Sequence, residues 1–366
     1  MKLFYTSFFL LIMSFAHAQD FEIYVSDAGN FNNPPWQILK FDQNGQNPSV
    51  FIDNNLNWPQ DILFLEDQNI VLISNLGSGR ITRHNASTGT FISDFATGIA
   101  GPTRIKIGPD SLLYVLQWNG AGIVKRYELD GTFVSDFTTV GVPQSIGLDW
   151  DSDKNLYVSS YNGDLVRKFD STGADQGVFI NTNLVGPTNI WFANNGDLLV
   201  SDYDGGSIKR FGSTGNFKGV FISGLRNSEG IAYMPSGNIL IGNGGTSSVK
   251  MFDANGTFIK DLVPPGTASL KNPNAVVIRS TSTVSITPAI KKKQGIVYPN
   301  TGTEFRFFPE IFDTSISLDV HTASGSHLIT IKERSWQADG VAEGVYIVVA
   351  KLRDGGVITQ RVVVQK

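Results

Sequence analysis

The sequence contains no cysteine and few histidines. Among its 366 residues, Cys is absent and His occurs four times. The absence of cysteine excludes disulfides, thiol catalysis, Cys-ligated zinc and iron–sulfur clusters. Charged residues are also scarce, at 17% of the chain, and the net charge of −4 gives no support for a nucleic-acid-binding protein.

Only one long apolar run occurs, and it lies at the N-terminus. Lys2 precedes a mostly apolar run from Leu3 to Phe15, and Ala16-His17-Ala18 forms a small-x-small cleavage site. The run is shorter than the about 20 residues that a membrane span needs, which disfavours a membrane anchor. Residues 1–18 are therefore predicted to be a signal peptide of a secreted or outer-surface protein without a transmembrane anchor.

Glycine-rich turns and short strands repeat along the middle of the chain. The repeat units open at Pro59, Pro102, Pro143, Pro187, Ser228 and Pro273, in steps of 41 to 45 residues. A period in the forties with about four strands is typical of a β-propeller blade. Within the units a glycine follows an aromatic residue by four positions, as in Phe169 and Gly173, which predicts a hairpin with a left-handed glycine.

The two ends of the repeat array are complementary. Residues 21–25 match the second strand of a unit, so the first unit lacks its opening strand. Residues 274–278 match an opening strand, and the other three strands of that unit are missing. Together they complete one blade, which removes the free sheet edges. We therefore predict an all-β fold, with a six-bladed β-propeller of four-stranded blades over residues 19–279, whose first blade is closed by the last strand. A linear solenoid would not explain the complementary half-repeats.

The composition changes after the array. Residues 280–297 are rich in Ser, Thr and Lys and are predicted to be a linker. Residues 298–366 show short alternating apolar runs, which predict a small C-terminal β-sandwich.

This C-terminal segment resembles the C-terminal sorting domain of the type IX secretion system of Bacteroidota. The residues that carry the resemblance are Tyr298-Pro299-Asn300, the Ser324-Gly325 turn, Gly344-Val345-Tyr346 and the terminal Val362 to Lys366, although the family usually has Pro where Thr301 stands. The resemblance implies recognition by the type IX secretion machinery, export across the outer membrane and removal of the tail. An ordinary β-sandwich accessory domain is the alternative.

The repeats resemble NHL-type and streptogramin-lyase-like propellers and, more distantly, gluconolactonases. The resemblance rests on the Pro-x-x-Ile, Leu-Tyr-Val-Ser and Ile-Lys-Arg-Phe strings. It implies the fold but leaves the activity open, because propellers host many functions. Streptogramin lyases use His with a metal, whereas His84, the one histidine of the repeats, is predicted to pack between blades.

The starts of the innermost strands and the ends of the second strands are expected at one face of the channel. The gluconolactonase resemblance implies metal-binding Glu, Asn and Asp residues there, and only Glu229 and Asn274 match in type. A hydrated polar channel is the favoured alternative. In a metal-dependent hydrolase or lyase, the candidate catalytic residues are Glu229, Asp202 and Arg104.

Three aromatic residues occupy equivalent loops of consecutive units, namely Trp118, Tyr161 and Tyr203. Equivalent loops lie on one face, so these rings, flanked by Asn and Asp, are predicted to form an arc that binds a glycan. The alternative is that each ring covers its own hairpin. Further ligand-binding candidates at this face are Asn189, Asp61 and Gln144.

A turn with alternating acids lies on the opposite face. Asp149, Asp151 and Asp153 have the spacing of calcium loops, and the turn is predicted to be two residues longer than the equivalent turn of the next unit. A structural calcium ion is therefore one hypothesis, and a solvated acidic turn is the favoured alternative. No other cofactor is indicated.

These observations favour a non-catalytic, extracellular or cell-surface recognition propeller that binds a glycan or polysaccharide. A lactonase- or lyase-like metal-dependent enzyme is the second hypothesis. A protein-binding scaffold that uses the rim loops without the aromatic arc is the third.

Overall fold

The computed structural model describes residues 21–281, 296–299, 301–313, 315–322, 326–353 and 357–366. The chain divides into two compact units, residues 1–282 and 283–366. The predicted signal peptide, most of the predicted linker, Asn300 and the Ser324-Gly325 turn lie outside the described residues. In the described part, no helix has both the length and the apolar character required to cross a membrane.

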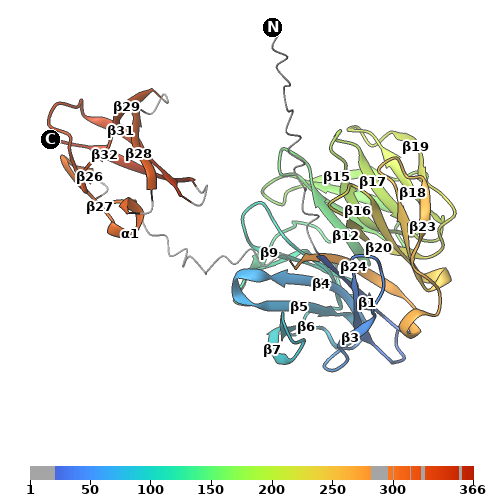
Figure 1. The fold of residues 1–366 in the computed structure, drawn as a ribbon. Helices are drawn as coiled ribbons and strands as arrows, with labels where there is room; N and C mark the ends of the chain where they lie inside the picture. The colour runs from blue at the N-terminus through green and yellow to red at the C-terminus, as the bar shows by residue number, and fades with distance from the viewer. Residues whose placement is uncertain (1–20, 282–295, 300, 314, 323–325, 354–356) are drawn as a thin grey trace, which may run out of the picture. The chain divides into compact units, whose positions relative to one another are not determined.

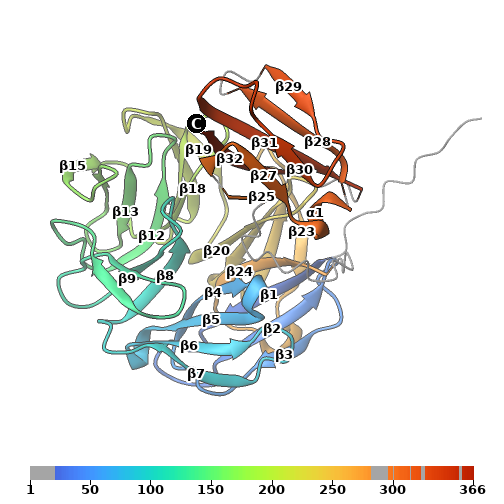
Figure 2. The ribbon, with the colours of Figure 1, turned by 90° about the vertical axis from the view of Figure 1, so that its left-hand side faces the viewer.

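The first unit is a six-bladed β-propeller in which every blade is a four-stranded antiparallel sheet (Figures 1 and 2). We number the blades from 1 to 6 and give their strands from the innermost to the outermost. Blade 1 contains β24 (Pro273–Ser280), β1 (Phe21–Asp27), β2 (Gln37–Asp42) and β3 (Ser49–Ile52). Blade 2 contains β4 (Pro59–Leu65), β5 (Ile70–Asn75), β6 (Arg80–Asn85) and β7 (Phe91–Ala96). Blade 3 contains β8 (Pro102–Ile107), β9 (Leu113–Gln117), β10 (Lys125–Tyr127) and β11 (Phe133–Asp136).

The other three blades repeat this order. Blade 4 contains β12 (Ser145–Trp150), β13 (Leu156–Ser160), β14 (Leu165–Phe169) and β15 (Asp175–Ile180). Blade 5 contains β16 (Pro187–Phe192), β17 (Leu198–Asp202), β18 (Ser207–Phe211) and β19 (Phe217–Ile222). Blade 6 contains β20 (Ser228–Tyr233), β21 (Ile239–Asn243), β22 (Ser248–Phe252) and β23 (Phe258–Val263). Short 3-10 helices lie at Glu66–Gln68, Leu76–Ser78, Gly244–Thr246 and Thr267–Ser269.

The last strand of the array closes the ring, as predicted. β24 pairs antiparallel with β1 from Phe21 opposite Ser280 to Asp27 opposite Pro273. In Figure 1 the orange β24 lies beside the blue β1. The Asp27 carboxylate secures this junction, because its Oδ1 accepts hydrogen bonds from the backbone N–H of Gly29 at 3.0 Å and of Asn272 at 2.9 Å. The closure pairs the inner edge of β1, which would otherwise be free.

The hydrophobic core lies between neighbouring blades. The second strand of each blade is buried over most of its length. Leu72 of the second strand and Ile81 of the third strand of blade 2, for example, pack with Ile105 and Leu113 of blade 3. Burial of one such side chain contributes about 1.5–3 kcal/mol. The blades are therefore held together mainly by apolar layers between sheets.

The predicted hairpin glycines adopt the left-handed conformation. The value of φ is +73° at Gly45, +97° at Gly131 and +88° at Gly173. It is also positive at Gly215 and Gly256, at +78° and +83°. At Gly173 a side chain would also collide with the backbone carbonyl of Phe137 in the preceding blade. Glycine is thus required both by the turn and by the close approach of the next sheet.

His84 is buried, and its hydrogen-bond partners Gly89 and Thr82 belong to its own blade. The ring Nδ1 lies 3.0 Å from the carbonyl oxygen of Gly89, and the ring Nε2 lies 3.1 Å from Thr82 Oγ1. Burial lowers its pKa, so the ring is neutral near pH 7.

The register of blade 4 differs from the sequence prediction. Ser145 pairs with Ser160 in the way that Pro102 pairs with Gln117, so the strand starts two residues after Pro143. Gln144 lies in the preceding loop, with φ of +55°.

This register also determines the length of the acidic turn. Trp150 pairs with Leu156 in blade 4, and Phe192 pairs with Leu198 in blade 5. Both turns therefore contain five residues, 151–155 and 193–197. The prediction of a turn two residues longer in blade 4 is wrong, because the additional residues precede the strand.

The second unit is a small β-sandwich, as predicted. One sheet contains β25 (Val297–Tyr298), β27 (Glu304–Phe307) and β30 (Ser335–Gln337). The other contains, in spatial order, β26 (Thr301–Gly302), β32 (Val357–Val364), β31 (Gly344–Leu352), β28 (Ser315–Thr322) and β29 (His327–Thr330). A single helical turn, α1, spans Pro309–Phe312. Phe305 and Trp336 of the first sheet pack with Val320 and Val348 of the second to form the core.

Candidate functional site

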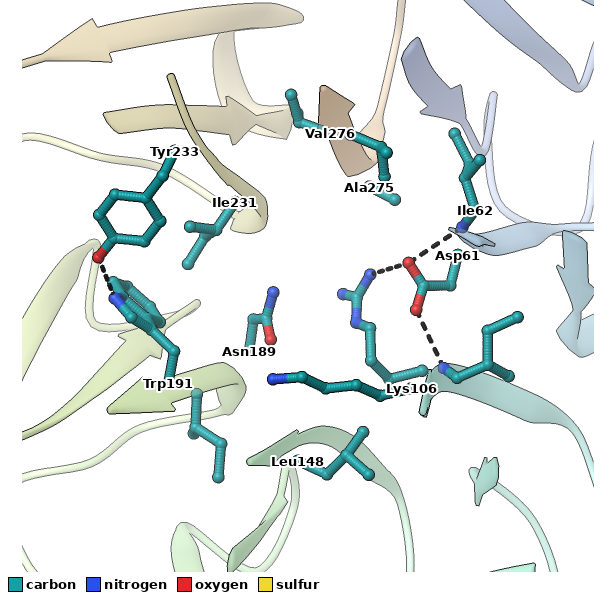
Figure 3. A pocket seen from close by; sticks show the side chains of 14 residues that line it. Asp61, Ile62, Lys106, Leu148, Asn189, Trp191, Ile231, Tyr233, Ala275 and Val276 are labelled. Atoms are coloured by element: carbon teal, nitrogen blue, oxygen red, sulfur yellow. Dashed lines mark hydrogen bonds and ion pairs between the residues drawn. The ribbon is translucent and has the colours of Figure 1, made fainter. Parts of the chain in front are cut away.

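The innermost strands surround a central cavity of about 220 Å³. Every blade contributes at least one aliphatic side chain to its wall, namely Ile62, Ile105, Leu148, Ile190, Ile231 and, from blade 1, Ala275, Val276 and Val277. Figure 3 shows Asn189 between Asp61 on one side and the hydrogen-bonded Trp191–Tyr233 pair on the other. The cavity is smaller than the roughly 300–1,000 Å³ of most small-molecule pockets.

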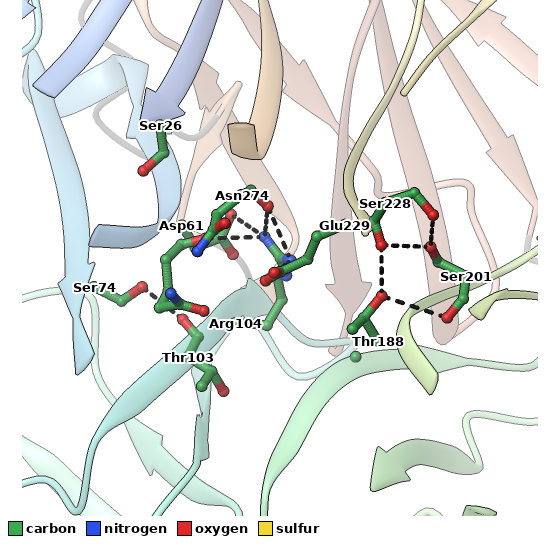
Figure 4. Close-up of polar contacts among 12 residues, drawn as sticks. Ser26, Asp61, Ser74, Thr103, Arg104, Thr188, Ser201, Ser228, Glu229 and Asn274 are labelled. Atoms are coloured by element: carbon green, nitrogen blue, oxygen red, sulfur yellow. Dashed lines mark hydrogen bonds and ion pairs between the residues drawn. The ribbon is translucent and has the colours of Figure 1, made fainter. Parts of the chain in front are cut away.

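An arginine and two carboxylates fill the channel where the innermost strands begin (Figure 4). Arg104 of blade 3 lies 3.2 Å from Asp61 Oδ1 of blade 2 and 3.2 Å from Glu229 Oε1 of blade 6. Its Nη1 also donates to the Gln60 carbonyl at 3.1 Å, and its Nη2 to the Asn274 carbonyl at 3.3 Å. One guanidinium thus connects four blades.

The ionisation of this cluster is strongly perturbed. The side chains of Arg104, Asp61 and Glu229 are each more than 90% buried. Burial raises the pKa of Glu229 to about 7, with a further contribution from Asp61, whereas Arg104 opposes the shift. The pKa of Asp61 is also raised by burial, against the effects of Arg104 and of two backbone N–H donors.

These residues do not fit a metal site of the kind that the gluconolactonase resemblance implies. Glu229 is one of the two matching residues, but its carboxylate faces the Arg104 guanidinium, whose charge would repel a cation. The other, Asn274, accepts from Arg104 through its backbone oxygen, and its Oδ1 is buried without a hydrogen-bond partner among the described residues. Within the described ranges no three Asp, Glu, His or Cys side chains are grouped so as to hold a metal.

Asp202 lies in a different environment. Its Oδ1 accepts the backbone N–H of Val185 at 2.6 Å, and its carboxylate pairs with Lys209 Nζ at 2.5 Å. Among the described residues its partners are therefore these two, and the structure does not bring it together with Arg104 and Glu229.

The position of Asp202 has the same role in every blade. The residue that ends each second strand bonds through its side chain to the loop that leads into the innermost strand of its own blade. These residues are Asp27, Asn75, Gln117, Ser160, Asp202 and Asn243. A polar side chain at one equivalent position in all six blades was the sequence signal for this structural role.

Hydroxyl groups connect neighbouring blades beside the cluster (Figure 4). Ser74 Oγ donates to the carbonyl of Thr103 at 2.5 Å, and Ser201 Oγ donates to that of Ser228 at 2.9 Å. Thr188 Oγ1 donates to the same Ser228 carbonyl at 3.1 Å. These groups satisfy the buried polar atoms at the starts of the innermost strands.

The three loop aromatics are in contact with one another. The ring centroids of Trp118 and Tyr161 are 5.6 Å apart, and those of Tyr161 and Tyr203 are 5.8 Å apart. The rings come from the loops that follow β9, β13 and β17, so they span blades 3, 4 and 5, and all three are half-buried. We refer to these three residues as the aromatic arc.

Hydrogen bonds fix the aromatic arc in place. Tyr161 Oη donates to Asp204 Oδ2 at 2.8 Å, which joins the loops of blades 4 and 5. The backbone of Gln144 bridges blades 3 and 4, because its N–H donates to the Trp118 carbonyl at 3.1 Å and its carbonyl accepts from the Tyr161 N–H at 3.0 Å. Gln144 thus adjoins the arc through its backbone.

The acidic turn of blade 4 does not gather its three carboxylates. Asp151 Oδ1 accepts the backbone N–H of Asp153 at 3.0 Å and of Asn155 at 2.9 Å, which caps the turn. Asp149 Oδ1 instead pairs with Lys106 Nζ at 2.6 Å, and its Oδ2 accepts the Phe192 N–H. Asp153 is exposed. Hydrogen bonds, including those from Asn155, lower the pKa of Asp151 against the opposing effect of burial.

Sequence reasoning missed Trp191, Tyr233 and Lys106 as cavity-lining residues. They lie further along the innermost strands than the positions considered from the repeat pattern. Lys106 and Trp191 stand at one equivalent position, where blades 1, 2 and 6 carry the aliphatic residues Val277, Leu63 and Ala232. Tyr233 stands one position further, where an aromatic residue is common to several blades and gives no signal.

Comparison with known proteins identifies the fold. No family model and no curated protein matches the chain. A chain of the nidogen/laminin complex has a TM-score of 0.57 and 15% identity, and the match covers 71% of this protein and 98% of that chain. A protein of unknown function from Bacteroides caccae has a TM-score of 0.56 and 13% identity over 71% and 99% of the two chains. A putative gluconolactonase has a TM-score of 0.51 and 16% identity over 62% and 90%. At these identities the likeness shows the β-propeller fold alone.

Proposed function

We propose that this protein is a non-catalytic recognition propeller that binds a glycan at the aromatic arc. The observation that carries the proposal is the continuous contact of Trp118, Tyr161 and Tyr203 across three blades. Half-buried rings offer apolar faces to the C–H groups of a sugar, and the exposed Asn119, Asn162 and Asp204 beside them offer hydrogen-bonding groups.

The shape of the arc favours a single soluble chain over a flat crystalline surface. Neighbouring rings are inclined by 47° and 75°, so they do not form one plane. A chain that bends along the arc can meet each ring in turn, whereas a flat array of sugars can meet only one ring face at a time.

A hydrolase or lyase is less well supported. The channel acids Glu229 and Asp61 are both paired with Arg104. Asp202 is bound to the Val185 N–H and to Lys209. None of these three carboxylates is free to act as a general base or a metal ligand without first losing a partner.

Affinity electrophoresis with laminarin, xylan, galactomannan and chitosan tests glycan binding. We expect retardation by at least one polymer, and we expect Trp118→Ala to weaken it about tenfold, since an aromatic anchor contributes more than 1 kcal/mol. Phe217→Ala is the matched control, because Phe217 is a 40% exposed aromatic on the outermost strand β19. Absence of retardation by all four polymers, or equal losses in both variants, would contradict the proposal.

We also propose that residues 298–366 serve as a type IX sorting domain that delivers the propeller to the cell exterior. Two of the segments that carry the resemblance belong to adjacent strands, since β31 starts with Gly344-Val345-Tyr346 and β32 includes Val362 to Val364. Both strands belong to a unit that is compact without the propeller.

Export is tested by fusing residues 280–366 to a secreted fluorescent reporter in a bacterium that has a type IX system. We expect the reporter outside the cell in the parent strain and inside a strain that lacks the translocon. Removal of residues 357–366 deletes β32 and should retain the reporter in the parent strain. Equal release from both strains would refute the sorting role.

A further inference from the structure

The carboxylates around the aromatic arc restrict which glycans it can take. Asp164 and Asp204 are both exposed and lie in the same loops as Tyr161 and Tyr203. Tyr161 Oη donates to Asp204, and Asp164 Oδ1 accepts the N–H of Gly186 at 2.7 Å. Within the described part of the chain, neither carboxylate has an ion-pair partner.

The electrostatic field at the rings is correspondingly negative. Burial and the bond to Asp204 raise the pKa of Tyr161 to about 12, and the charges of Asp204 and Asp164 contribute in the same direction. The pKa of Tyr203 is raised by burial and then by Glu229. The nearby cation Lys209 is neutralised by its ion pair with Asp202.

We infer that the aromatic arc selects glycans without acidic groups and binds amino sugars best. This inference rests on the proposed glycan-binding function. A protonated amino group gains from the carboxylates of Asp164 and Asp204 and from the ring faces, whereas a uronate or sulfate is repelled by the same carboxylates. A neutral sugar meets the rings without either effect.

Titration calorimetry with three hexamers of one backbone tests the inference. The probes are β-1,4-linked hexamers of glucosamine, glucose and glucuronic acid at pH 6, which differ mainly in charge. We expect the glucosamine hexamer to bind roughly fivefold more tightly than the glucose hexamer, and the glucuronic acid hexamer to bind roughly fivefold more weakly, because exposed charge pairs contribute modestly. The differences should shrink in 0.5 M salt.

The double variant Asp164→Asn, Asp204→Asn isolates the charges, because an asparagine side-chain oxygen can still accept the bonds from Gly186 and Tyr161. We expect it to bind the three hexamers with nearly equal affinity. Equal affinities in the wild type, with binding lost in Trp118→Ala, would overturn the charge selectivity and leave the glycan site standing. Failure of all three hexamers to bind would overturn the preference for amino sugars, whereas the glycan site itself fails only if laminarin, xylan, galactomannan and chitosan also cause no retardation.

Discussion

The channel cluster allows a quantitative prediction for Arg104→Met. Methionine retains apolar volume but removes the charge that faces Asp61 and Glu229 and the donors to two backbone carbonyls. Removing one partner of a buried ion pair costs about 3–5 kcal/mol. At about 2–4 °C per kcal/mol, we expect the melting temperature of the propeller to fall by about 10 °C.

The dependence of this loss on pH identifies its cause. Asp61 keeps two backbone donors, from Ile62 and Ile105, so most of the cost falls on Glu229. Protonation of Glu229 removes the cost of its unpaired buried charge. The loss of stability in Arg104→Met should therefore be larger at pH 8.5 than at pH 5.5. Calorimetry of the whole protein at both pH values measures this difference.

The matched control is Arg226→Met. Arg226 is an exposed arginine in the loop before β20, and we expect its replacement to change the unfolding free energy by less than about 0.5 kcal/mol. A loss below about 1 kcal/mol for Arg104→Met at both pH values would refute the account of the channel.

Three further predictions concern the propeller. The folded-state pKa of Glu229 is raised from 4.5 to about 7, so the folded state binds more protons than the unfolded state between these pH values. The unfolding free energy should therefore fall by up to about 3 kcal/mol as the pH rises from 4.5 to 7. Denaturant titrations at several pH values should show a smaller fall for Glu229→Gln, in which the remaining dependence on pH comes from Asp61. Deletion of residues 273–366 removes β24 and should abolish the cooperative unfolding transition in circular dichroism, whereas a propeller that still melts cooperatively would contradict the role of closure. A methyl group at Gly205 would overlap the Asp202 carboxylate, so Gly205→Ala should cost about 2 kcal/mol in chemical denaturation, and an unchanged midpoint would show that the loop relaxes freely.

The sequence allowed the blades and their closure to be predicted because each depends on local periodicity. Strand alternation and turn glycines such as Gly173 repeat in register, and the half-repeats at the two ends complement each other. The start of the innermost strand of blade 4 was predicted two residues too early, because Pro143 resembles the proline that opens the equivalent strand of other blades. Those prolines are buried, as at Pro102 and Pro187, whereas Pro143 is exposed in the loop.

The candidate site was predictable only in part. Equivalent loop positions predicted that the three aromatic residues share a face, and the structure places them in contact. The partners of Arg104 were not predictable, because a repeat pattern gives the level of a residue along the channel but not which side chain extends across it. Arg104 reaches Glu229 of blade 6 because its long side chain spans the channel.

The pairing of β24 with β1 also sets an order of events in time. The chain supplies β1 first, but the strand that completes blade 1 comes more than 250 residues later. At synthesis rates of about 5–20 residues per second, this blade waits for its innermost strand for tens of seconds. The same order applies to a chain that crosses a membrane from its N-terminus. The first blade to emerge is thus the last to be completed, and its exposed edge needs protection until then.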